Sequence, residues 1–161
     1  MRSQTQLPRR QQKGFTLIES LISLIVLSIG LLGIAALFFE GLKSGRTAIF
    51  RTEAVYLAGD LADRIRANPA GLDSYELDGN DDVVCVGKEK NCDGADMAIY
   101  DRYIWEKEIA SLMPGGTTFG VTFTDGDPVD TYTISINWLE PGFVDANGDP
   151  APLNYTLEFV F

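Results

Sequence analysis

Few residues in this chain are suited to chemistry, and the clearest are two cysteines, Cys85 and Cys92. Two thiols can close a disulfide, or they can supply half of the four ligands that a structural zinc ion needs. The chain contains no histidine among its 161 residues, so a zinc site would be incomplete. The same absence excludes catalytic triads and general bases that depend on histidine. We therefore expect no metal site and no cofactor.

The second notable residue is a carboxylate, Glu19, at the start of a long apolar segment. The segment from Ser20 to Phe39 contains no charged residue. Its length is about the ~20 residues that a bilayer-spanning helix needs. A carboxylate in a membrane segment costs about 2.5–3.5 kcal/mol unless it finds a partner, and the helix itself offers none. Glu19 therefore either stays hydrated near the membrane interface or binds a positive group outside its own helix.

Charge is distributed unevenly along the chain. The basic residues before the apolar segment are Arg2, Arg9, Arg10 and Lys13, with no acidic residue among them. The rest of the chain contains nine basic and 23 acidic residues, a net charge of −14. The positive-inside rule then predicts a cytoplasmic N-terminus and an exported C-terminal domain. Disulfides persist outside the cytoplasm, so we expect the two cysteines to be bonded. An acidic domain repels phosphate backbones, so no nucleic-acid partner is expected.

A single long helix is predicted from Phe15 to Ala67, a stretch without proline. Its first part is apolar on every side, and its second part is apolar on one face only. That face consists of Phe50, Ala54, Leu57, Leu61 and Ile65, which recur at three- and four-residue spacing. Pro69 ends the helix because proline disfavours the helical region for the preceding residue. At ~1.5 Å per residue the helix is roughly 80 Å long, so only its first part fits a hydrocarbon core of about 30 Å.

The C-terminal half predicts a second, short helix and three strands. Helical spacing of apolar residues runs from Met97 to Leu112 and ends at Pro114. Apolar residues then alternate with polar ones over residues 119–123, 132–138 and 153–161, with turn residues between these stretches. An antiparallel sheet packed on the amphipathic half of the long helix is the simplest arrangement, which gives an α+β fold. The apolar run at 83–86 is a candidate for one further strand.

Two acidic stretches place oxygen ligands at alternate positions, as calcium loops do. They are residues 78–82 and 145–149. Both lack the glycine at position six and the glutamate at position twelve of an EF-hand. Turn chemistry alone accounts for both stretches, and calcium binding is kept only as a minor hypothesis.

The residues Lys13-Gly14-Phe15-Thr16-Leu17-Ile18-Glu19 resemble the processing site of type IV prepilins. That site has a short basic leader, a small residue before the cut, phenylalanine at the new N-terminus and a glutamate as fifth mature residue. The resemblance implies cleavage by a prepilin peptidase after Gly14 and N-methylation of Phe15. It also implies that Glu19 accepts the terminal amine of a neighbouring subunit during assembly. A secretory signal is the alternative, but it would have an apolar core of about 7–15 residues and a small-residue cleavage site.

Three further segments look similar to the V-type minor pilin family. They are residues 60–69 at the end of the long helix, Trp105 ahead of 112–116, and 132–138. Many pilins have a proline in the membrane half of the helix, and this chain has none. The resemblance implies a non-enzymatic subunit that primes assembly of a type IV pilus and is incorporated near its tip. The implied partners are other minor pilins, the major pilin and the inner-membrane assembly platform.

Two rival functions follow from the same residues. The pseudopilin I subunit of type II secretion resembles the same N-terminal half, so a minor pseudopilin is an alternative. A membrane-anchored enzyme with acidic catalytic residues is a remote one, which would need two carboxylates converging in a cleft.

The expected organisation has four parts. They are a leader peptide at 1–14, the transmembrane half of the long helix at 15–40, its periplasmic half at 41–68, and a periplasmic α+β pilin domain at 69–161. This arrangement implies a single-pass inner-membrane protein with a cytoplasmic N-terminus, which is later assembled into the extracellular pilus. The fold implied is type IV pilin-like.

Overall fold

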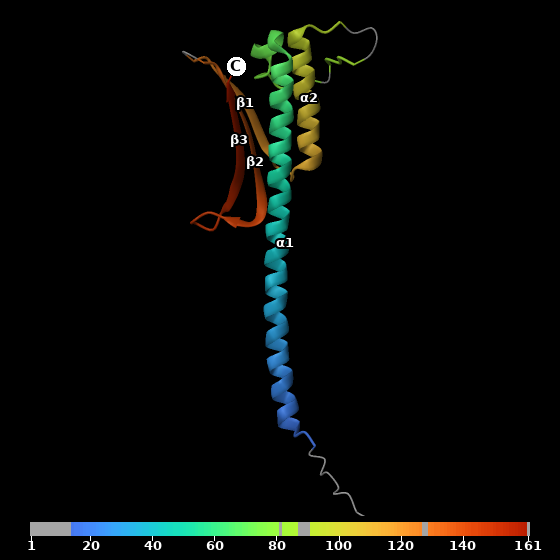
Figure 1. Cartoon of the computed structure of the whole chain (residues 1–161), viewed down its shortest axis with the longest axis vertical. Helices are drawn as coiled ribbons and strands as arrows, with labels where there is room; N and C mark the ends of the chain where they lie inside the picture. Colours follow the sequence, from blue (N-terminus) through green and yellow to red (C-terminus); the bar gives the residue numbers. More distant parts are fainter. Residues whose placement is uncertain (1–13, 81, 87–90, 127–128, 161) are drawn as a thin grey trace, which may run out of the picture. The chain divides into compact units, whose positions relative to one another are not determined.

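The computed structural model describes residues 14–80, 82–86, 91–126 and 129–160 (Figure 1). The predicted leader, residues 1–14, therefore lies outside the described residues except for Gly14. Two compact units divide the chain, one ending at Ser44 and the other beginning at Gly45. The elements in chain order are α1 (Leu17–Ala67), the short 3-10 helix η1 (Pro69–Ser74), α2 (Gly94–Leu112), β1 (Thr118–Thr124), β2 (Thr131–Val144) and β3 (Pro150–Val160).

Local hydrogen bonds and a proline mark the two ends of helix α1. At its start, the Thr16 carbonyl accepts the N–H of Ser20 at 3.2 Å, which is the first hydrogen bond of the helix. At its end, the N–H of Asn68 donates to the Ile65 carbonyl at 3.1 Å, a tighter turn than the α-helical one. Pro69 then opens η1, because proline is tolerated at the first position of a helix. The prediction of one long helix ending before Pro69 is confirmed.

Helix α2 begins three residues before the predicted start at Met97. Asp93 is its N-cap residue, and the Asp93 side chain accepts the backbone N–H of Asp96 at 2.9 Å. An N-cap carboxylate satisfies one of the N–H groups that the first turn leaves unpaired, so the helix extends back to Gly94. The apolar spacing used for the prediction begins only at Met97, one residue before Ala98, the first buried residue of the helix.

The three strands form an antiparallel sheet in the order β1-β2-β3, as predicted. Val121 of β1 is opposite Ile134 of β2, and Ile136 of β2 is opposite Tyr155 of β3, so these apolar residues share one face. The register shifts between Leu139 and Val144, where β2 has a bulge or irregularity. The candidate strand at residues 83–86 is absent, since these residues have no regular secondary structure.

The core lies where α1, α2 and the sheet meet within the second unit. In Figure 1 the sheet lies on one side of the corresponding part of α1 and α2 lies on another. Helix α1 contributes the predicted face, in which Ala54, Leu57, Leu61 and Ile65 are fully buried. The other large, almost completely buried side chains are Tyr75, Trp105, Ile109, Tyr132, Ile134, Ile136 and Trp138. The fold is therefore α+β, with a long N-terminal helix, a short second helix and a three-stranded antiparallel sheet.

Hydrogen bonds of buried or half-buried polar side chains connect the layers, among them those of Trp105, Tyr132 and Glu140. Trp105 Nε1 of α2 donates to the carbonyl of Leu57 in α1 at 2.8 Å. The Tyr132 hydroxyl of β2 donates to the carbonyl of Leu72 in η1, also at 2.8 Å. Glu140 of β2 is only 5% exposed, and its carboxylate accepts Trp138 Nε1 at 2.7 Å and Thr47 Oγ1 of α1 at 2.8 Å. Each bond satisfies a polar group that burial would otherwise leave unpaired.

Candidate assembly site at the start of α1

The residues before α1 are exposed and extended away from any packing partner. Phe15 is 82% exposed, although it is a large aromatic residue. Gly14 has open space around it, and a Cβ added there would meet no described atom within 4 Å. Nothing in the described structure therefore requires a glycine at 14 or a phenylalanine at 15. Residue types that the fold does not need are candidates for recognition by another molecule.

Glu19 lies in the first turn of α1, where Thr16 is the residue before the helix. The Glu19 backbone N–H donates to Thr16 Oγ1 at 3.3 Å, so the threonine caps the helix through its side chain. The Glu19 carbonyl accepts the hydroxyl of Ser23 at 2.8 Å. The Glu19 carboxylate makes no hydrogen bond or ion pair with the residues that the structure describes. It is available to a group from outside, and the negative charge is favourable at a helix N-terminus. The sequence analysis did not predict that Thr16 caps the helix, although Ser or Thr three residues before Glu is a known signal for a helix N-terminus.

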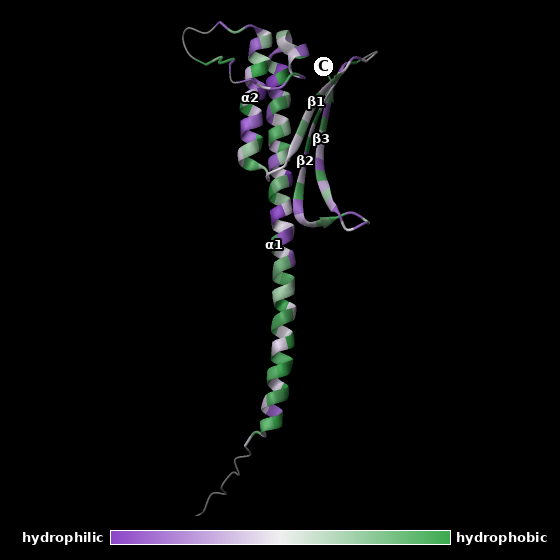
Figure 2. Cartoon of the chain, turned by 180° about the vertical axis from the view of Figure 1, so that it is seen from behind, coloured by the Kyte–Doolittle hydropathy of each residue, from purple (hydrophilic) through white to green (hydrophobic). Residues whose placement is uncertain are grey.

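The first half of α1 presents an apolar surface that no part of its own unit covers. Large apolar side chains from Leu17 to Leu42 are 52% to 90% exposed. Figure 2 shows mainly hydrophobic colouring along the first part of the helix. Among the described residues, α1 is the one helix that is long and apolar enough to cross a membrane. A surface of this size requires lipid or other apolar helices around it.

The serine side chains of this segment donate hydrogen bonds to backbone carbonyls of the same helix. Ser23 Oγ donates to the Glu19 carbonyl, and Ser28 Oγ donates to the Leu24 carbonyl at 2.7 Å. In hydrocarbon each unpaired polar group costs several kcal/mol. These serines are therefore compatible with a lipid environment, and Glu19 is the one charged residue between Leu17 and Phe39.

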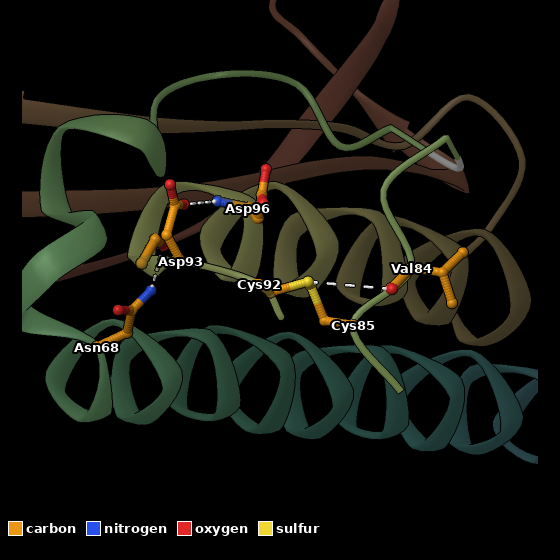
Figure 3. The surroundings of a disulfide bond; sticks show 7 residues. Asn68, Val84, Cys85, Cys92, Asp93 and Asp96 are labelled. Carbon is orange, nitrogen blue, oxygen red and sulfur yellow. Dashed lines mark hydrogen bonds between the residues drawn. A yellow bond between two sulfur atoms is a disulfide. The ribbon is translucent and has the colours of Figure 1, made fainter. Parts of the chain in front are cut away.

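Cys85 and Cys92 form a disulfide bond beside the start of α2 (Figure 3). Cys92 directly precedes Asp93, the cap of α2, and its sulfur lies 3.9 Å from the Val84 carbonyl. Asn68, just beyond the end of α1, donates to the Gly94 carbonyl at 2.8 Å. The disulfide loop is thus connected through the α2 cap to the C-terminal end of α1.

The acidic stretch at 145–149 is held by bonds within its own turn. Asp145 Oδ1 accepts the backbone N–H groups of Asn147 and Asp149 at 2.8 and 3.0 Å. These backbone hydrogen bonds, the one from Asp149 foremost, hold the pKa of the Asp145 carboxyl below its usual value. Within 78–82, Asp81 lies outside the described residues, and Asn80 Oδ1 accepts the N–H of Asp82. No group of three or more metal-binding side chains is present among the described residues.

Several charged residues elsewhere pair within the fold. Arg102 is 2% exposed, and it donates to Glu106 Oε1 at 3.0 Å and to the Tyr75 carbonyl at 3.2 Å. Arg64 bridges Asp60 of its own helix and Asp101 of α2, at 2.7 and 3.1 Å. The (i, i+4) spacing of Arg102 and Glu106 was readable from the sequence, but the burial of the arginine was not. The bonds from Arg64 to Asp101 and from Arg102 to Tyr75 hold α2 against its neighbours. These ion pairs are explained by their structural role, and we assign them no catalytic one.

Two family models match consecutive parts of the chain. Residues 9–35 match the prokaryotic N-terminal methylation motif, and residues 36–103 match a family described as type IV pilin Tt1218. No curated protein and no solved structure matches the chain. The first match contains Gly14, Phe15 and Glu19, and the second contains the rest of α1, η1 and half of α2.

A long apolar N-terminal helix that carries this motif, followed by an α+β domain, defines the class of pilins and pseudopilins. The chain is a type IV pilin-like protein.

Proposed function

We propose that this chain is a minor pilin, a structural subunit that is processed, inserted in the inner membrane and incorporated near the tip of a type IV pilus. The observation that carries the proposal is the placement of the methylation motif at the start of an apolar helix whose only charged residue before Glu40 is Glu19. The pilin match over 36–103 supports a structural and not an enzymatic role.

Processing would divide the chain as follows. A prepilin peptidase removes residues 1–14 by cutting after Gly14, and Phe15 becomes the N-methylated terminus. Residues 15–40 span the inner membrane, and residues 41–68 continue the helix into the periplasm, where its C-terminal part packs in the core with the domain at 69–161. The exposed apolar side chains of the first part of α1 support membrane insertion, and the disulfide supports an oxidising compartment for the domain.

Assembly would then depend on Glu19 and the new N-terminus. In a stack of subunits the Glu19 carboxylate of one helix lies near the Phe15 amine of its neighbour. At ~4 Å and an effective dielectric of ~20, this pair has roughly 4 kcal/mol of Coulomb attraction. That energy is similar to the cost of placing a carboxylate in the membrane, about 2.5–3.5 kcal/mol. Possession of Glu19 therefore favours a place beneath at least one other subunit.

The minor class and the tip position rest on the resemblance to V-type minor pilins. Their implied partners are other minor pilins, the major pilin and the assembly platform in the inner membrane. A minor pseudopilin of type II secretion is the rival function. Neighbouring genes for pilus assembly or for secretion would decide between them, as would loss of pili or loss of secretion when the gene is deleted.

The test is mass spectrometry of this subunit in sheared filaments. A mature terminus at methylated Phe15, at an abundance far below that of the main subunit, is the expected result.

Glu19→Leu should be inserted and processed normally but should reach filaments poorly. The matched control is Glu158→Leu, the same substitution at an exposed residue of β3. Wild-type amounts of Glu19→Leu in filaments would refute the proposed role of the carboxylate.

A further inference from the structure

The turn that joins β2 to β3 contains a chemically labile pair of residues, Asn147 and Gly148. They form the one Asn-Gly dipeptide in the chain. In such a pair the backbone nitrogen of the glycine can attack the side-chain amide carbon of the asparagine, because glycine has no side chain to hinder the approach. Both residues are exposed at one end of the sheet (Figure 1). A Cβ placed at Gly148 would meet no described atom within 4 Å, so water reaches this turn.

The fold requires the glycine of this pair. Gly148 has a φ of +90°, a backbone conformation that residues with a Cβ rarely adopt. Its N–H donates to the Asp145 carbonyl at 3.1 Å, and the Asp145 N–H donates to the Asp149 carbonyl at 2.8 Å. These two bonds close the hairpin between β2 and β3. A different residue at position 148 would strain the hairpin, so the turn keeps a glycine directly after Asn147.

Asp145 holds both groups that would react. Its carbonyl accepts the Gly148 N–H, which carries the proton that the attacking nitrogen must lose. Its carboxylate accepts the Asn147 backbone N–H at 2.8 Å and Asn147 Nδ2 at 3.3 Å. Attack requires the asparagine side chain to rotate toward the backbone of Gly148, and this rotation breaks the bond from Nδ2. The negative charge of the carboxylate also opposes the anion that forms on the Gly148 nitrogen.

We propose that Asn147 is a latent deamidation site and that Asp145 is the residue that protects it. When the contacts with Asp145 are lost, the Gly148 nitrogen gives up its proton and forms a bond to Asn147 Cγ. The Cγ–Nδ2 bond breaks, and Nδ2 leaves as ammonia with that proton. Water then opens the cyclic imide at one of its two carbonyl carbons, which gives aspartate or isoaspartate at position 147. One water is consumed and one ammonia released, without any oxidant or reductant.

The modification changes both the charge and the geometry of the turn. It places a new carboxylate between Asp145 and Asp149, and it removes the Nδ2 donor that binds Asp145. Like charges at this distance repel each other. Isoaspartate also directs the main chain through the former side chain, which alters the path of the hairpin. We therefore expect deamidation to open the turn between β2 and β3. Neither the site nor its protection depends on the proposed function.

The first test compares the folded with the unfolded chain. The full chain in detergent micelles is incubated at mildly alkaline pH, with and without guanidinium chloride. Peptide mass spectrometry follows the amide-to-acid change at Asn147 and separates aspartate from isoaspartate. The folded chain should react at least about tenfold more slowly, because hydrogen bonds to Asp145 must break before the attack. Equal rates in the folded and the unfolded chain would overturn the proposal.

The second test assigns the protection to Asp145. Asp145→Ala removes the carboxylate and keeps the backbone carbonyl, and it should speed conversion of Asn147 about tenfold. Asp149→Ala is the matched control: it removes the same charge from the other end of the turn and should leave the rate unchanged. Tryptophan fluorescence shows whether each variant is folded.

Asp145→Ser carries the test if Asp145→Ala does not fold. Serine keeps an acceptor oxygen for the backbone N–H groups of the turn but has no charge, so its rate should lie between those of the wild type and the alanine variant. A wild-type rate in a folded Asp145 variant would overturn the role of Asp145. Equal acceleration by Asp149→Ala would also overturn it, because the protection would then come from the charge of the turn as a whole.

Discussion

Trp105 of α2 donates its indole N–H to the backbone carbonyl of Leu57 in the C-terminal half of α1, at 2.8 Å, and both residues are fully buried. A helical carbonyl has a second lone pair, so it can accept this bond in addition to its helical one. The Trp105 ring also meets Phe119 of β1 edge to face, with ring centroids 5.3 Å apart. One side chain thus links both helices and the sheet, which makes it the central contact of the domain.

Replacing Trp105 by phenylalanine should destabilise the domain by about 1–3 kcal/mol. The change leaves a cavity and removes the bond to Leu57, and each effect alone costs on the order of 1 kcal/mol. Urea unfolding of the full chain in micelles would measure this, with the fluorescence of buried Trp138 as probe. Tyr56→Phe, at a residue of α1 that is 60% exposed, is the control and should change the free energy of unfolding by less than about 0.5 kcal/mol. An equal effect of both changes would contradict the central role of Trp105.

Two glycine-to-alanine substitutions should change the free energy of unfolding in opposite directions. A Cβ at buried Gly71 of η1 would overlap the backbone carbonyl of Gly94, so Gly71→Ala forces the two segments apart and should cost several kcal/mol. A Cβ at Gly59, in the interior of α1, meets nothing within 4 Å. Gly59→Ala should therefore stabilise the domain by up to about 1 kcal/mol through helix propensity. Thermal unfolding of both variants measures the difference. A stable Gly71→Ala would mean that η1 and the start of α2 are not in contact.

The domain should lose stability as the pH rises above about 10, in part because of Tyr132. Burial foremost, and then the nearby charges of Asp73, Glu76 and Asp130, raise the pKa of the Tyr132 hydroxyl to about 12 from its usual value of 10.0. Between these two values the unfolded chain releases the proton and the folded chain retains it, so the free energy of unfolding falls with rising pH.

Tyr132→Phe is the variant that checks this pH dependence. It should lower the free energy of unfolding at neutral pH by about 0.5–1.5 kcal/mol, because the bond to the Leu72 carbonyl is lost. The free energy of unfolding of this variant should also fall less steeply between pH 10 and pH 12 than that of the wild type. Urea titrations at several pH values measure both effects. An unchanged slope in Tyr132→Phe would assign the alkaline loss to other groups.

Removing the disulfide should destabilise the domain by roughly 2.5 kcal/mol, the value that the chain-entropy model gives for a loop of this size. The bond joins residues seven apart, so it closes a small loop next to the α2 cap. The measurement compares urea unfolding of the wild type with the double variant Cys85→Ser and Cys92→Ser. The serine at position 111, which is exposed on α2, offers a Ser111→Ala control. Free thiols in protein recovered from the periplasm would contradict the bond itself.

A bulky residue at position 14 should prevent leader removal. Gly14→Leu places a large side chain directly before the expected cut, where the peptidase has to accommodate it. Gly30→Leu, a glycine of α1 that also has open space around it, is the matched control and should be processed normally. Immunoblotting measures the result, because the unprocessed and the processed chain differ in molecular weight. Normal processing of Gly14→Leu would place the cut elsewhere.

Much of the architecture could be predicted because its signals are local. The apolar run after Glu19, the stop at Pro69 and the alternation along 132–138 each depend on residues within one or two turns or strands. The sheet order also followed from local signals, since short turns favour neighbouring strands that pair antiparallel. The candidate strand at 83–86 was wrong because an apolar run becomes a strand only where another strand pairs with it.

The sequence by itself determined the apolar helix, the motif around Gly14, Phe15 and Glu19, and the pattern of three strands, since each is encoded by neighbouring residues. Only the tertiary structure decided which distant groups meet. It placed the Trp105 indole on the Leu57 carbonyl, packed Gly71 against Gly94, and stacked Arg66 over the Phe159 ring at 4.5 Å. Such contacts join residues 23 to 93 positions apart. Their geometry is set by how whole elements pack, and no periodicity along the chain records it.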